Sequence, residues 1–272
     1  MDWAPQPGAA VAIREGTGTA SVSFRGQVAE VSLSSGPLNL VTKGLLRALN
    51  RILADLARRD DVRCVILHGG EARAFCAGSD IKEFAEIYRD ASEHKILFED
   101  MVLRSLARLP MPTIAAIDGP ALGGGLELAL CCDIRVLRDG VQVGLPECHI
   151  GGLAGNGSVR LTRLVGPARA KEMLFTGMMI SSARALDWGI VNRVATEGPA
   201  LDEARCLAEE IARRGPVSNR LAKELVEAAL DAALDAALSR STVAQQAIFD
   251  SLDLQEGATA FLAKRVPVFQ GR

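Results

Sequence analysis

The sequence predicts an α/β fold in layers, with parallel strands in the first two thirds of the chain and helices in the last third. Residues 64–67 and 113–117 are short apolar runs typical of buried strands, and each precedes a loop and a helical stretch. Beyond Gly166 the pattern is almost entirely helical, interrupted by a short strand expected at 190–194. A chain of 272 residues suggests one large domain or two small ones.

The N-terminal part of the chain contains three different patterns. Residues 1–20 are rich in Gly, Ala, Pro and Thr, which predicts an irregular lead-in. The alternating runs 21–24 and 28–33 flank an Arg-Gly pair and predict a β-hairpin. Thr42 is suited to cap a helix over 45–56, because the leucines and isoleucine there recur at helical spacing.

Further elements are expected in the middle and at the end of the chain. A helical stretch ends near Leu109, where two prolines follow. Residues 126–132 are apolar nearly all round, which predicts a buried helix, and short strands are expected at 133–137 and 141–143. The alanine-rich stretch 217–238 has acids and leucines at three- and four-residue intervals, which predicts a helical region whose apolar faces need a partner.

Composition excludes several classes of protein. Hydrophobic residues make up 49% and charged residues 24% of the chain, which is ordinary for a globular protein and excludes a disordered or fibrous one. Lys and Arg number 31 against 33 Asp and Glu, so the basic excess of a nucleic-acid binder is absent. Aromatic residues, which stack on bases, are only 4%.

Neither a membrane span nor an export signal is expected. The longest uncharged runs, 31–42 and 148–159, are shorter than the ~20 apolar residues of a membrane-spanning helix. Asp2 and the lack of a basic region before an apolar stretch argue against a signal peptide. The six cysteines follow no disulfide or zinc spacing, so they are interpreted as buried thiols in a reducing cytoplasm.

Two strand-to-loop junctions, at 74–80 and 119–127, are candidates for binding an anion or a polarised oxygen. Each contains glycine and leads into a helix, so its backbone N–H groups are able to approach a ligand closely. Two such loops side by side would direct two amides at one oxygen atom, as an oxyanion hole requires. Alternatively, the glycines serve only tight turns and close helix packing.

Glu127 and Glu147 are the candidate acid and base. Glu127 is the charged residue of an otherwise apolar helix, where burial raises a carboxyl pKa and the helix N-terminus lowers it. That balance suits proton transfer near neutral pH. Glu147 follows Pro146 in a loop. Taken singly, each acid has a structural alternative as a favourable first-turn residue of a helix.

Other catalytic motifs do not occur in the sequence. It contains neither a P-loop nor a G-x-G-x-x-G fingerprint, and Ser79 has neither a G-x-S-x-G context nor an evident base partner. Glu147, Cys148 and His149 are contiguous, which is not metal-ligand spacing, so no metal is expected.

Five segments share their order and spacing with a known family: 74–83, 112–129, 144–147, 160–166 and 256–265. Over roughly residues 20–270 the chain resembles the enoyl-CoA hydratase/isomerase (crotonase) family. The resemblance implies a spiral of ββα units followed by C-terminal helices that pack in trimers, often stacked as hexamers. It places a ββα core with the acyl-CoA site at 20–200 and a helical oligomerisation region at 201–272.

The resemblance also implies roles for individual residues. The backbone amides of Ser79 and Gly124 would form the oxyanion hole, and Glu127 and Glu147 would match the two carboxylates of the hydratases. The residues implied to bind CoA are Ala77, Ser79, Asp80, Ile81, Lys82, Gly124 and, from a neighbouring subunit, Lys264. Because CoA is part of the substrate thioester, no separate cofactor is expected.

The chain departs from the family pattern in two places. Ser79 stands where a small Ala or Gly is usual, and because the backbone amide acts there, the oxyanion hole is expected to survive. Residues 148–158 differ beside the acyl pocket, which affects the identity of the substrate more than the class of reaction.

By this resemblance the expected activity is enoyl-CoA hydration, the reversible addition of water to a trans-2-enoyl-CoA to give a 3-hydroxyacyl-CoA. The alternative is a 3-enoyl to 2-enoyl-CoA isomerase, which needs chiefly one acid–base group. A third and less favoured alternative is a non-enzymatic crotonase-fold protein that binds RNA or a protein partner. The balanced charge and both retained glutamates argue against it, so the expected partners are an acyl-CoA and further copies of the chain, with neither nucleic acid nor membrane.

Overall fold

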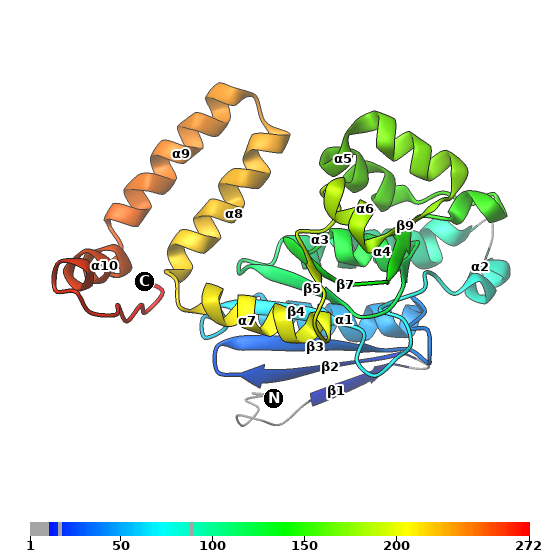
Figure 1. The fold of residues 1–272 in the computed structure, drawn as a ribbon, viewed down its shortest axis with the longest axis horizontal. Coiled ribbons are helices and arrows are strands. Elements are labelled where there is room, and N and C mark those ends of the chain that lie inside the picture. Colours follow the sequence, from blue (N-terminus) through cyan, green and yellow to red (C-terminus); the bar gives the residue numbers. More distant parts are fainter. Residues whose placement is uncertain (1–10, 16–17, 88–89) are drawn as a thin grey trace.

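The chain folds into two β-sheets with helices packed against them (Figure 1). A computed structural model describes residues 11–15, 18–87 and 90–272. The larger sheet has the strand order β1-β2-β3-β4-β5-β7-β10 and the smaller sheet the order β6-β8-β9. The strands are β1 (Val11–Glu15), β2 (Gly18–Arg25), β3 (Val28–Ser34), β4 (Cys64–His68), β5 (Thr113–Ile117), β6 (Ala121–Leu122), β7 (Ile134–Arg138), β8 (Gln142–Gly144), β9 (Met179–Ser181) and β10 (Arg193–Ala195).

Helices connect these strands and complete the chain. They are α1 (Lys43–Leu56), α2 (Ile81–Ile87), the π-helical turn η2 (Ser92–Ile96), α3 (Leu97–Ala107), α4 (Gly124–Leu130), the 3-10 turn η3 (Glu147–Ile150), α5 (Gly155–Thr176), α6 (Ser182–Asp187), α7 (Ala200–Ala212), α8 (Pro216–Asp231), α9 (Leu234–Phe249) and α10 (Leu252–Leu262). Thr42 caps α1 as predicted, because its hydroxyl oxygen accepts a hydrogen bond from the Leu45 amide at 3.1 Å.

The two faces of the larger sheet bury separate hydrophobic clusters. In β4, Val65 and Leu67 pack in the cluster that contains α1 and α4, whereas Cys64 and Ile66 pack in the cluster that contains α7. This alternation arises because successive side chains of a strand point to opposite faces. Strands that are buried on both faces consist of continuous apolar runs, as predicted here. The expected α/β fold with buried parallel strands is confirmed.

The N-terminal prediction is confirmed for the hairpin and wrong for part of the lead-in. Strands β2 and β3 pair antiparallel, with Arg25 opposite Val28 across the turn. Residues 11–15, expected to be irregular, form β1 and pair antiparallel with β2. A five-residue strand carries too little alternation to stand out in a Gly- and Thr-rich segment. Residues 1–10 lie outside the described part of the chain.

Three further predictions need correction. Strand β9 was not expected, and β10 begins three residues later than the predicted strand 190–194 and ends one residue after it. The stretch 217–238 is divided between α8 and α9, because the backbone at Ala232 is extended, with φ −117° and ψ 161°. Neither glycine nor proline marks this break, so the sequence contained no local signal for it.

The cysteines are free, and their burial differs from the prediction in two cases. Four of them are buried: Cys64, Cys76, Cys131 and Cys132. Cys148 is half-buried in η3, and Cys206 is exposed on the outer side of α7, so the interpretation as buried thiols is wrong for these two.

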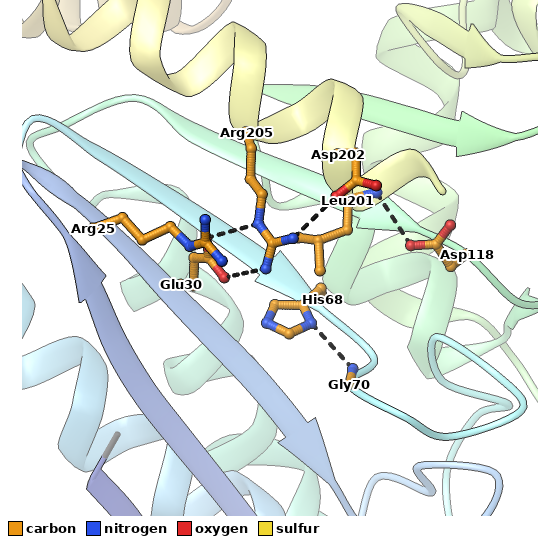
Figure 2. Close-up of polar contacts among 8 residues, drawn as sticks. All are labelled: Arg25, Glu30, His68, Gly70, Asp118, Leu201, Asp202 and Arg205. Carbon is orange, nitrogen blue, oxygen red and sulfur yellow. Dashed lines mark hydrogen bonds and ion pairs between the residues drawn. The ribbon is translucent and has the colours of Figure 1, made fainter. Parts of the chain in front are cut away.

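Figure 2 shows the polar contacts that hold α7 against the larger sheet. The Arg205 guanidinium of α7 donates to both carboxylate oxygens of Glu30 in β3, at 2.9 and 2.8 Å. The carboxylate of Asp118 accepts hydrogen bonds from the first two amides of α7, at Ala200 and Leu201. Burial alone would raise the pKa of Glu30, but the hydrogen bonds and charge of Arg205 hold it below its usual value. Charge pairing therefore compensates the burial of Glu30.

The three C-terminal helices α8, α9 and α10 extend away from the sheets (Figure 1). Helix α7, which we predicted as the start of the C-terminal region, packs against β4, β5 and β7. The boundary between 20–200 and 201–272 stays a prediction. The extending helices expose many large apolar side chains, including Val226, Leu230, Leu234, Leu238, Val243, Phe249, Phe261 and Leu262. Within the described residues, none of the helices is both long and apolar enough to cross a membrane.

Removing Arg205 is expected to destabilise the fold. Arg205→Ala leaves the 5%-exposed Glu30 carboxylate with only the exposed Arg25 as a partner. We expect the free energy of unfolding to fall by about 2–3 kcal/mol in a urea titration, because breaking a buried pair leaves a charge uncompensated. Arg213→Ala, which removes an exposed ion pair of the same helix with Glu209, is the control and should have little effect. Equal losses in the two variants would contradict the assigned role of the Glu30 pair.

Candidate active site

The two predicted loops lie side by side. The loop after β4 and the loop after β5 form a parallel bridge between Cys76 and Ala121. The Cys76 amide donates to the Pro120 carbonyl at 3.3 Å, and the Leu122 amide donates to the Cys76 carbonyl at 3.0 Å. Backbone pairing therefore fixes the position of one loop relative to the other.

Glycine is required where these loops meet. A Cβ atom at Gly125 would lie 1.9 Å from the Cys76 carbonyl oxygen, which excludes any side chain. Gly123 has φ +53°, in the left-handed region, and a Cβ there would lie 2.9 Å from the Glu147 Oε1. The glycines of 119–127 thus serve close packing, and that packing brings the loops to the carboxyl groups.

The amides of Ser79 and Gly124 are available to a ligand. A Cβ placed on Gly78 would lie 3.9 Å from the Gly124 nitrogen, so the two loop ends are neighbours. Among the hydrogen bonds of the described residues, none uses the amide N–H of Ser79 or Gly124 as its donor. Gly124 is the first residue of α4, where backbone N–H groups have no partner inside the helix. These two amides are therefore suited to donate hydrogen bonds to one oxygen atom of a ligand.

Glu127 lies in the first turn of α4 and is 8% exposed. Its Oε1 accepts a hydrogen bond from the Gly157 amide at 2.6 Å. Burial raises the pKa of Glu127, and hydrogen bonds from the amides of Gly157 and Asn156 partly oppose that effect. The N-terminus of α5 therefore orients this carboxylate.

Glu147 begins the η3 turn, after β8. Within the described structure, its Oε2 is a buried oxygen with no hydrogen-bond partner. Burial raises the pKa of Glu147 to about 6, and the charge of the neighbouring Glu127 acts in the same direction, while its own backbone amide opposes them. A carboxyl group with an unsatisfied oxygen and a pKa near neutrality is suited to exchange a proton.

A third carboxyl group, Glu99 of α3, lies at the same place and was not predicted. Its Oε1 is 3.5 Å from the position that a Cβ on Gly124 would take, and the Ser79 Oγ is 3.3 Å from that position. A signal was present in the sequence. Glu99 shares a helical face with Val102, Leu103 and Leu106, so a charged residue stands where the periodicity requires an apolar one.

Burial raises the pKa of Glu99 to about 7. The positive charge of Lys95 lowers it, the nearby carboxylates of Glu127 and Glu83 raise it further, and the Ser79 hydroxyl lowers it through a hydrogen bond. Three carboxyl groups thus share one low-dielectric region, where like charges disfavour simultaneous ionisation.

Lys95 supports the loop after β4 through the backbone of Val41, and it was also not predicted. Its side chain is fully buried, and its Nζ donates to the Val41 carbonyl at 2.7 Å and pairs with Glu83 Oε2 at 3.2 Å. The Val41 amide donates to the Gly78 carbonyl, and the Val41 carbonyl accepts from the Asp80 amide. Lys95 therefore fixes the backbone that carries Ser79.

The residues expected to bind CoA fall into two groups. Ala77 donates its amide to the Leu38 carbonyl, and the Asp80 carboxylate accepts from the Lys82 amide at the start of α2. Ile81 and Lys82 are exposed beside Ser79, so this group lies next to the acids. Lys264 is exposed just after α10, and Figure 1 shows α10 and α2 at opposite ends of the molecule. Within a single chain, Lys264 therefore lies far from the other residues that were expected to bind CoA.

Known proteins are similar to this chain in sequence and in fold. A family model described as enoyl-CoA hydratase/isomerase matches residues 23–272. The chain is 36% identical to an enoyl-CoA isomerase/hydratase of Mycosarcoma maydis, over 76% of this chain and 77% of the relative. It is 33% identical to the short-chain-enoyl-CoA hydratase of Clostridium acetobutylicum, over 88% and 93%. The crystal structure of an enoyl-CoA hydratase from Bacillus anthracis has a TM-score of 0.89 at 36% identity, covering 93% of this chain and 99% of that one.

These matches define the class of protein. The fold is the crotonase fold, in which an α/β core is followed by C-terminal helices. The chain belongs to the enoyl-CoA hydratase/isomerase family.

Glu99 is expected to make stability depend on pH. Its pKa is about 7 in the folded state and near 4.5 in the unfolded chain, so the folded state binds more protons between these values. Its contribution therefore becomes less favourable as pH rises from about 4.5 to 7 and then levels off. In urea titrations, Glu99→Gln should match the parent at pH 4 and gain about 1–3 kcal/mol at pH 8.

Glu93→Gln makes the same chemical change at an exposed position of η2 and serves as the control. It should show no gain at either pH. A Glu99→Gln effect that is constant from pH 4 to pH 8 would contradict the raised pKa.

Proposed function

We propose that the protein is an enoyl-CoA hydratase, which adds water reversibly to a trans-2-enoyl-CoA and forms a 3-hydroxyacyl-CoA. The observation that carries this proposal is the meeting of Glu127 and Glu147 at the loop that presents the free amides of Ser79 and Gly124. Hydration needs one group to take a proton from water and another to deliver one to carbon, and it needs stabilisation of the thioester oxygen.

The two amides would bind the thioester oxygen. As water adds, negative charge develops on that oxygen in an enolate-like transition state, and two fixed N–H donors stabilise it. The donors come from paired loops, so they need little rearrangement when the substrate binds. Ser79 contributes its backbone amide, and its hydroxyl is not required for this step.

The two carboxyl groups would move the protons. Glu127 takes a proton from the water whose oxygen bonds to C3. The Gly157 amide holds the Glu127 carboxylate in place through a hydrogen bond to its Oε1. Glu147 delivers a proton to C2, and its raised pKa of about 6 keeps a useful protonated fraction near neutral pH. Together the steps add one hydroxyl group and one hydrogen atom, which is one molecule of water.

The second candidate is isomerisation of a 3-enoyl-CoA to a 2-enoyl-CoA. One observation favours it: Glu147 has an unpaired oxygen, whereas Glu127 is already engaged with Gly157. An isomerase needs one group that removes a proton at C2 and returns it at C4, so one free carboxyl group is sufficient. The names of relatives include both activities.

The proposed CoA site would include a second subunit. Residues from Ala77 to Lys82 would bind the part of CoA near the thioester, and Lys264 would reach the nucleotide phosphate of a neighbouring copy. The apolar side chains exposed on α8, α9 and α10 support assembly into a trimer or a hexamer. The six unpaired cysteines support a reducing compartment such as the cytoplasm.

The assembly is tested by charging one face of α9. Leu234 and Leu238 are 72% and 56% exposed and lie one helical turn apart. Replacing both by Glu should convert the trimer or hexamer to smaller species in light scattering, because buried charges disfavour an apolar interface. Gln245→Glu, at an exposed polar position of the same helix, is the control. A parent protein that is monomeric would contradict the proposed assembly.

Glutamine substitutions separate the two activities. With crotonyl-CoA as substrate, loss of the enoyl absorbance should be rapid for the parent and about 10²–10⁴-fold slower for Glu147→Gln, the typical contribution of an acid–base group. Glu127→Gln should also abolish hydration, because it removes the group that activates water. In an isomerase, conversion of a 3-enoyl-CoA should instead survive Glu127→Gln. Glu93→Gln is the matched control for both assays.

Hydration that is unaffected by Glu127→Gln would contradict the two-carboxylate mechanism. A parent that isomerises a 3-enoyl-CoA faster than it hydrates crotonyl-CoA would favour the second candidate.

A further inference from the structure

Glu99 is the acid of this site for which the proposed hydration has no use. It is 9% exposed, and its Oε1 lies 3.5 Å from the position that a Cβ on Gly124 would take, beside the Ser79 hydroxyl. Among the described residues, Glu99 has no ion pair within 4 Å, because the neighbouring Lys95 is engaged by Glu83 and the Val41 carbonyl. The Ser79 hydroxyl is a polar group beside it and lowers its pKa.

A purely structural role does not account for this position. An ionised carboxylate accepts about four hydrogen bonds, and a hydroxyl group such as that of Ser79 donates at most one. A buried carboxyl group with open acceptor positions is less favourable than an apolar side chain of the same size. Residues that weaken a fold in this way are typical of binding and catalytic sites.

We infer that Glu99 is a specificity residue, which selects acyl-CoA thioesters that carry a hydroxyl group on the acyl chain close to the thioester. The inference rests on the proposed function, because it places the thioester oxygen at the amides of Ser79 and Gly124. Glu99 Oε1 lies 3.5 Å from the Cβ position of Gly124, so it would reach an acyl substituent only a few bonds from the carbonyl carbon.

The surroundings define the chemistry of that substituent. An unsubstituted acyl chain would cover Glu99 without giving it a donor, which leaves a desolvated carboxyl group unsatisfied. A carboxylate on the chain would be repelled by Glu99, Glu127 and Glu147. A cation would have to share Glu99 with Lys95, whose positive charge already acts on this carboxyl group. A neutral hydroxyl group donates a hydrogen bond and meets none of these penalties.

The test measures binding of saturated thioesters, which hydration cannot consume. Isothermal titration of the intact protein at pH 8 compares 4-hydroxybutyryl-CoA with pentanoyl-CoA, and 2-hydroxybutyryl-CoA with 2-methylbutyryl-CoA. In each pair a hydroxyl group replaces a methyl group of similar size. The parent should bind the hydroxylated member of at least one pair about tenfold or more tightly than its isostere, as expected for a hydrogen bond to a charged group.

Variants at Glu99 assign that preference to the carboxyl group. Glu99→Met keeps the length of the side chain and should abolish the preference, as should Glu99→Leu, which provides a second apolar replacement. Glu93→Gln should preserve it fully, since it removes a carboxylate from the same helical stretch outside the site.

The possible results separate this inference from the proposed reaction. Equal binding of both members of each pair by the parent, or an unchanged preference in Glu99→Met, would overturn the inference. If the parent binds no CoA thioester, the acyl-CoA site and the inference both fail. If the Glu99-dependent preference is found but crotonyl-CoA is not hydrated, the inference stands and the proposed reaction is wrong.

Discussion

The close approach of the loops after β4 and β5 is the constraint on which the rest of the site depends. Gly125 packs directly on the Cys76 carbonyl, and the bridge between Cys76 and Ala121 fixes the loops in register. Every group of the candidate site is placed relative to this contact. It sets the separation of the Ser79 and Gly124 amides, it starts α4 and so positions Glu127, and it brings Gly123 against Glu147.

The packing of these loops also buries the acids of the site, and burial changes their pKa values. The site gathers Glu99, Glu127 and Glu147 in a region with little water, and burial raises the pKa of all three. Each is compensated differently: Glu127 by the α5 amides, Glu99 in part by Lys95, and Glu147 least of all, since its Oε2 has no partner within the described structure. The opposite face of the sheet shows the contrast. There Glu30 is also buried, but Arg205 satisfies both its oxygens, so the same residue type serves stability instead of proton transfer.

The features that the sequence could predict are those with a local signal. Buried strands, the Thr42 cap and the glycine loops follow from residue types a few positions apart, whereas the joint role of Glu127 and Glu147 was implied by the family resemblance and stays a prediction. Glu99 interrupts an apolar helical face, but neither its place at the site nor that of Lys95 could be derived from it, because both depend on how η2 and α3 pack against Val41 and Gly124, which lie far away in the chain. The break at Ala232 is similar, because alanine favours continuing the helix and only tertiary packing directs the chain elsewhere.

The positions of these groups also separate chemistry from assembly. The amides, the three carboxyl groups and Lys95 all belong to residues 79–147, within the α/β core. The exposed apolar side chains of α8, α9 and α10, and Lys264, lie beyond residue 225, in the part of the chain that extends away from that core. The core has its own hydrophobic clusters on both faces of the sheet, and the amide that orients Glu127 belongs to Gly157 of α5. Loss of the proposed assembly should therefore weaken the binding of CoA through its nucleotide end, while the geometry at the thioester stays as it is.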